Sequence, residues 1–150
     1  MTTALHDIEN RADCELLVRR FYSRALTDNL IGWIFTDVAQ LDLESHVPRI
    51  ASFWESVLLG AQSYPGGAFA PHATLHARAG LKPGHFARWL LLWGESVDEL
   101  FRGDLAEQAK AHAARVAAAF QRRLNVLGQG PGGTPSSGSL SISWHGPTEA

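Results

Sequence analysis

Seven histidines are the side chains of this 150-residue chain best suited to chemistry, because imidazole is a common ligand of transition metals. His72 and His76 stand four residues apart in the segment PHATLH, a spacing that places both on one face of a helix. A zinc site of the His-Glu-x-x-His kind needs a glutamate after its first histidine, and a thiolate site needs more than the single Cys14. These residues therefore indicate an imidazole–metal site, with zinc the less favoured metal.

His46 and Tyr22 are polar residues within apolar helical stripes. Ile50 and Phe53 follow His46 by four and seven residues, so the three share one helical face. Such a histidine is more often a core residue with a satisfied ring than a ligand. The Tyr22 hydroxyl likewise needs a partner if it is buried. The other histidines are expected to be solvated or, at a helix start, to cap the helix: His6, His85, His112 and His145.

Composition and motifs exclude several classes of function. The 13 basic and 15 acidic residues give a net charge of −2 without a basic patch, which argues against nucleic-acid and membrane partners. No apolar run approaches the roughly 18 residues of a membrane span. A Gly-x-Ser-x-Gly elbow, a phosphate loop and a dinucleotide fingerprint are all missing from the sequence. The lone Cys14 and the acidic N-terminal segment predict a reduced, cytoplasmic setting.

Two helices are predicted in the first part of the chain to position these residues. Apolar residues recur at helical spacing from Ile8 to about Thr27. The segment TDNLIGWIF then interrupts the pattern with turn residues and presents Trp33 and Phe35. A second helix, which carries His46, is expected to reach Leu59 and to end at Gly60.

The second part of the chain is predicted to hold a long loop and two more helices. The loop spans residues 63–84 and is rich in Gly and Pro. A third helix begins near Pro83, a residue suited to a first turn, and the last runs from Leu105 to Leu127. No segment indicates a strand, so the fold class is all-α. The domain is expected to span residues 1–127, and the Gly/Pro/Ser-rich tail, 128–150, is expected to be disordered.

Four segments, taken in order, resemble the truncated haemoglobins of group III. The first is similar to the family's second helix and following turn, and the second to its distal helix, with His, Ile and Phe-Trp in the same spacing. The third carries the family's pattern of Tyr, Gly, an apolar residue and His, and the fourth its aromatic helix facing the haem. The segments are FYSRALTDNLIGWIF (21–35), ESHVPRIASFWESVLLG (44–60), YPGGAFAPHATL (64–75) and HFARWLLLW (85–93).

The resemblance implies a two-over-two helical sandwich around a non-covalently bound haem b. His72 would be the proximal ligand of the iron, which leaves one coordination position open. Tyr22, His46 and Trp89 would line the opposite face, where each is able to donate a hydrogen bond to a bound ligand. Apolar and aromatic side chains would wall the macrocycle: Phe35, Ile50, Phe53, Phe86 and Trp93.

Two features depart from the family pattern. Counted forward from Tyr64, His72 has the spacing of group III, but a few extra residues separate it from Trp89. Counted backward from HFARW, His76 is the alternative ligand, as in groups I and II. Pro48 lies two residues past His46. It would either bend the helix or occupy its first turn, and in the second case His46 would lie in the segment before the helix.

The implied function is reversible binding of oxygen or another diatomic ligand, with slow release because three donors surround it. A first alternative is an enzyme that reduces peroxide or converts nitric oxide, which would need an electron source such as an unidentified reductase. A second alternative is a haem-free helical interaction module whose aromatic residues are only core.

Overall fold

The computed structural model describes residues 4–62, 64, 66, 73 and 76–129, and the side chains up to residue 125. The first helix, α1, spans Arg11–Ala25 and begins three residues later than Ile8, the start expected from the sequence. Asn10 sets this start, because its side chain accepts a hydrogen bond from the backbone N–H of Asp13 at 2.9 Å. Ile8 is instead buried ahead of the helix.

A π-helix, η1, spans Ile34–Val38 and follows the turn that the segment TDNLIGWIF predicted. Its i to i+5 pattern appears in the bond from the Ala39 N–H to the Ile34 carbonyl, 2.8 Å. Gly32 precedes it, where a Cβ atom would lie 2.8 Å from the Leu26 carbonyl oxygen. The close approach of two backbone segments thus requires glycine at this position.

The second helix, α2, spans Leu43–Leu59 and ends at Gly60, as predicted. Gly60 has φ 76° and closes the helix with a left-handed cap. Pro48 lies inside α2, beyond its first turn, so the interpretation that places His46 in the segment before the helix is wrong. The His46 N–H already donates to the Asp42 carbonyl at 3.0 Å, which makes His46 part of the helix.

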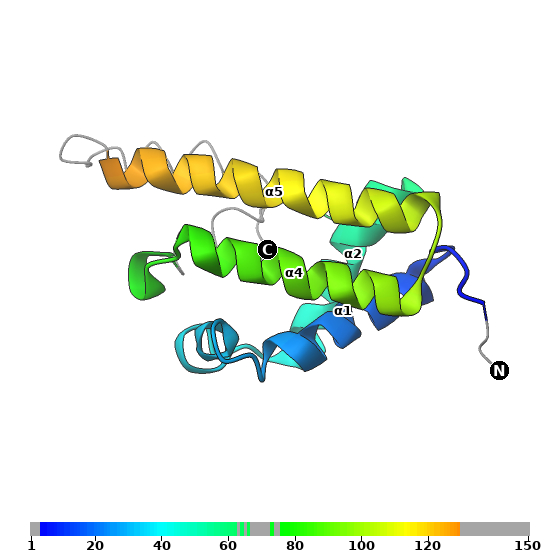
Figure 1. Cartoon of the computed structure of the whole chain (residues 1–150), viewed down its shortest axis with the longest axis horizontal. Helices are drawn as coiled ribbons and strands as arrows, with labels where there is room; N and C mark the ends of the chain where they lie inside the picture. The colour runs from blue at the N-terminus through cyan, green and yellow to red at the C-terminus, as the bar shows by residue number, and fades with distance from the viewer. Residues whose placement is uncertain (1–3, 63, 65, 67–72, 74–75, 130–150) are drawn as a thin grey trace.

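Two long helices complete the fold. The predicted start at Pro83 is confirmed for α4, Pro83–Leu100, and α5 spans Asp104–Gln129, two residues past the predicted end. The two helices run antiparallel, side by side (Figure 1). Asp7 holds the start of α5, because its carboxylate accepts the backbone N–H groups of Leu105 and Ala106 at 2.9 and 2.8 Å.

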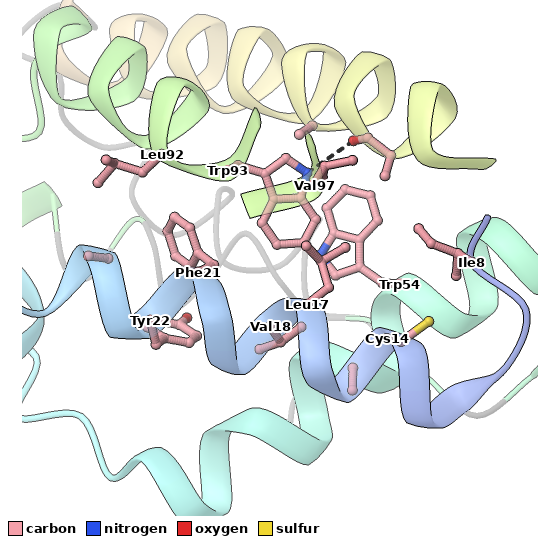
Figure 2. Close-up of a cluster of buried hydrophobic side chains, with 14 of the residues drawn as sticks. Ile8, Cys14, Leu17, Val18, Phe21, Tyr22, Trp54, Leu92, Trp93 and Val97 are labelled. Atoms are coloured by element: carbon pink, nitrogen blue, oxygen red, sulfur yellow. Dashed lines mark hydrogen bonds between the residues drawn. The ribbon is translucent and has the colours of Figure 1, made fainter. Parts of the chain in front are cut away.

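The helices form two packed pairs, α1 with α2 and α4 with α5, and the pairs meet through contacts of α1 with α4 and of α2 with α5. The α1–α4 contact includes Arg24, which pairs with Glu99 at 2.6 Å and donates to the buried Ser96 hydroxyl at 3.1 Å. In Figure 2, the side chains of α1 meet Trp54 of α2 and Trp93 of α4 between the pairs.

The predicted all-α class is confirmed, since the described residues form helices and turns without a strand. None of the described helices is long and apolar enough to cross a membrane. Residues 130–150, the greater part of the tail predicted to be disordered, lie outside the described residues.

Candidate functional site

A cavity of about 470 Å³ lies among all the described helices. Apolar and aromatic side chains dominate its lining, from Phe21 of α1 to Phe120 of α5. Eight of the nine site residues expected from the sequence line this one cavity: Tyr22, Phe35, His46, Ile50, Phe53, Phe86, Trp89 and Trp93. The ninth, His72, lies outside the described residues.

Tyr22 and His46 form a polar pair in this apolar lining. They come from α1 and α2, and their ring centroids lie 5.6 Å apart in an edge-to-face arrangement. Burial raises the pKa of the Tyr22 hydroxyl well above its ordinary value, so the group stays protonated at neutral pH. The hydroxyl has no hydrogen-bond acceptor among the described residues. Tyr22 is therefore a donor in the cavity wall that no described residue satisfies.

Two stacked indoles of α4 form another part of the cavity lining. Trp89 and Trp93 lie one helical turn apart on α4, with ring centroids 6.3 Å apart and an interplanar angle of 11°. Trp93 also stacks on Trp54 of α2 at 4.6 Å (Figure 2), and its N–H donates to the Ala109 carbonyl at 3.2 Å. The Trp89 N–H has no acceptor in the described part of the chain. Trp89 is thus a second available donor, while Trp93 is committed to the core.

Asp28 fixes the turn after α1 against the same stretch of α4. Its side chain is only 5% exposed and pairs with Arg88, the neighbour of Trp89, at 2.8 and 2.9 Å. The same carboxylate accepts the N–H groups of Leu30 and Ile31 at 2.9 and 3.0 Å. The Arg88 guanidinium lowers the pKa of Asp28, so the carboxylate is charged at neutral pH.

His76 makes a hydrogen bond that bears on its chemistry. Its Nδ1 accepts the Leu81 N–H at 3.0 Å, so in the neutral ring the proton is carried by Nε2. A metal-bound histidine shows the opposite polarity, because it donates its second ring N–H to a carbonyl or carboxylate. His76 is also absent from the described residues that line the cavity.

Several lining residues were not among the site residues expected from the sequence. Arg78 and Tyr64 come from the Gly- and Pro-rich segment, where periodicity does not reveal which side chains face inward. Arg78 is exposed at the cavity and forms no ion pair with any described residue. His85 caps α4, as expected, by accepting the Lys82 N–H at 3.0 Å, and it lines the cavity as well.

His112 differs from its expected solvated state. It is half-buried on α5, and its ring lies 5.9 Å from that of Phe53 and 5.8 Å from that of Trp54. Burial lowers its pKa, followed by a smaller effect of Arg115. The sequence suggested a polar face because alanine and charged residues surround His112, whereas α5 packs on α2 at this position.

The chain resembles a known protein in both sequence and fold. No family model matches the chain. The group 3 truncated hemoglobin ctb of Campylobacter jejuni is 25% identical over 122 residues, which cover 79% of this chain and 94% of that protein. The crystal structure of a group III truncated hemoglobin from Campylobacter jejuni superposes with a TM-score of 0.71 at 25% identity. That match covers 81% of this chain and 95% of the other.

The chain has the fold of a group III truncated haemoglobin. The resemblance expected from four sequence segments is therefore confirmed by an alignment of the sequence and by the fold. The two helix pairs are the two-over-two sandwich of a truncated globin. The chain is similar to a truncated haemoglobin in sequence and in fold, and its cavity lies between the helix pairs that this fold brings together.

Proposed function

We propose that this chain is a haem b protein that binds oxygen or another diatomic ligand reversibly. The observation that carries the proposal is the cavity around which eight residues expected to contact a haem come together. Such a convergence from three separate helices and a π-helix is not required by packing alone. The similarity to truncated haemoglobins over about four fifths of the chain supports the same function.

The cavity residues fit this cofactor. Haem is a flat apolar plate with carboxylates at one edge, and the lining is apolar with a cation, Arg78, at the exposed part. Phe35, Ile50 and Phe86 would pack against the plate and exclude water. Arg78 would pair with a carboxylate, as guanidinium groups do in other proteins.

His72 is the residue we propose as the iron ligand, on its spacing from Tyr64 in the sequence. Imidazole suits iron, and a haem held by one histidine supplies an open position for a small ligand. The alternative, His76, would first have to release the Leu81 N–H and move its ring proton to Nδ1. This requirement favours His72.

Tyr22 and Trp89 would hold the ligand from the other side. Each has a polar hydrogen without an acceptor among the described residues, and both line the cavity. A partly negative diatomic ligand would accept these hydrogens. His46, half-buried against the Tyr22 ring, would be a third donor or would limit access to the ligand.

An optical spectrum of the purified protein tests the proposal. An intense visible band is expected, and it should be lost or strongly altered in His72→Ala but retained in His76→Ala. Loss of the band only in His76→Ala would assign the ligand to His76 instead.

A colourless protein that stays colourless after haemin is added would contradict the function and favour a haem-free helical module. Steady turnover of peroxide or nitric oxide with a reductant would favour an enzyme over a ligand-binding protein.

A further inference from the structure

A second set of metal-binding groups lies at the beginning of the chain, away from the residues that line the cavity. His6, Glu9 and Asp13 each offer one ligand atom, and these three atoms lie within 4.8 Å of one another. They form the one set of three such groups in the described part of the chain. Small rotations of exposed side chains would bring them to the separations that a bound ion requires.

The His6 ring has the polarity that a metal ligand needs. One ring nitrogen, Nδ1, lies 2.5 Å from the Asp7 carbonyl oxygen, which accepts and cannot donate, so this nitrogen carries a hydrogen. The second nitrogen, Nε2, is then left with its lone pair in the neutral ring. Metal-bound histidines are commonly oriented by such a bond to a backbone carbonyl. His76 has the reverse arrangement, since its Nδ1 accepts a backbone N–H.

Two of the three side chains, those of His6 and Asp13, are held in place by contacts with the rest of the fold. The His6 carbonyl accepts the Arg102 N–H at 3.0 Å, and the His6 ring packs on Phe101 at 5.7 Å, so the residue is attached to the corner between α4 and α5. Asp13 lies in the first turn of α1, where one carboxylate oxygen accepts the Glu9 N–H at 2.8 Å. The other Asp13 oxygen is left for an ion.

We propose that His6, Glu9 and Asp13 bind a divalent first-row transition metal ion, with Zn²⁺ as its representative. One imidazole and two carboxylates form a mixed nitrogen and oxygen set, which suits such ions better than Mg²⁺ or Ca²⁺. Three protein ligands leave the remaining positions to water. The ion would connect the start of α1 to the α4–α5 corner and brace the N-terminal segment against the domain.

Zinc titration of the full-length protein by calorimetry at pH 8, where imidazole is neutral, tests the site. One equivalent is expected to bind, and His6→Ala and Glu9→Gln should each weaken this binding by about tenfold or more. Asp13→Asn should weaken zinc binding as well, while the asparagine oxygen still accepts the Glu9 N–H. Glu44→Gln is the matched control, because it removes one negative charge from an exposed side chain of another helix, and it should bind zinc as the parent does.

Thermal unfolding gives a second measurement that does not depend on the cavity. Zinc should raise the melting temperature of the parent and of Glu44→Gln, because an ion that binds only the folded state stabilises it. The melting temperatures of His6→Ala and Glu9→Gln should be the same with and without zinc. Zinc binding of equal strength in the parent and His6→Ala, or no binding to the parent, would overturn the proposal. Neither result would bear on haem binding.

Discussion

Tyr22 is the residue at which the proposed function is most directly open to test. Removing its hydroxyl by Tyr22→Phe deletes a hydrogen-bond donor but leaves the ring, which packs edge-on against Phe21 and Phe35. A hydrogen bond to a charged acceptor contributes about 1.5–3 kcal/mol, so oxygen should dissociate roughly ten to a hundred times faster. Stopped-flow displacement of oxygen by carbon monoxide measures this rate.

The second tyrosine of the chain supplies the control for this experiment. Tyr64 also lines the cavity, next to Phe53 at 5.3 Å, but it comes from a different segment. Tyr64→Phe removes the same hydroxyl and should change the dissociation rate much less. Equal rates in the parent and Tyr22→Phe, or equal acceleration in both variants, would contradict the role of Tyr22.

At the scale of elements, Asp28 is expected to hold the turn after α1 against α4. Asp28→Ala removes a buried carboxylate from Arg88 and from two backbone N–H groups. A hydrogen bond to a charged group contributes about 1.5–3 kcal/mol, so the free energy of unfolding should fall by about 2 kcal/mol or more. Urea denaturation followed by circular dichroism measures the change.

Glu44→Ala serves as the control for the Asp28 variant. Glu44 is 78% exposed and pairs with Arg19 at 3.4 Å, so its loss should change the free energy of unfolding by only about 0.5 kcal/mol or less. Similar effects of the two substitutions would show that the buried carboxylate has no special part in the stability of the turn.

Asp7 makes the start of α5 sensitive to acid. Burial raises the pKa of Asp7, but hydrogen bonds from the backbone N–H groups of Leu105, Ile8 and Ala106 lower it by more. The net pKa therefore lies below the ordinary value. A carboxyl whose pKa is lower in the folded state adds stability above its unfolded pKa, and this stability is lost as the pH falls through the folded pKa. Asp7→Asn should therefore show a smaller loss of stability than the parent between about pH 5 and pH 2. Denaturation midpoints measured across this range test the difference, and parallel pH profiles for the two proteins would contradict it.

For the whole molecule, the sequence predicted the features that local chemistry determines. Gly60 ends α2 and Pro83 starts α4, because a left-handed cap and a fixed φ act on the residues next to them. The start of α1 was less well predicted, since Ile8 continues the apolar pattern although Asn10 caps the helix. The burial of His112 and the position of Arg78 depend on packing between distant segments. Helical periodicity therefore predicted the cavity residues that lie on helices well, and those of the Gly- and Pro-rich segment poorly.

Removal of the haem should lower the stability of the molecule without abolishing its helices. A bound ligand in excess stabilises the folded state by RT ln(1 + [L]/Kd), which is about 4 kcal/mol at a thousand times Kd. The cavity would lose its occupant, whereas buried residues such as Leu17, Val47 and Val97 would keep their mutual contacts. The apoprotein should thus retain most of its helical circular dichroism at low temperature and melt at a lower temperature than the haem-loaded protein. Adding haemin should restore the higher melting temperature in the parent but not in His72→Ala. Identical melting curves with and without haem would mean that the cavity is not where the cofactor binds, whatever colour the preparation has.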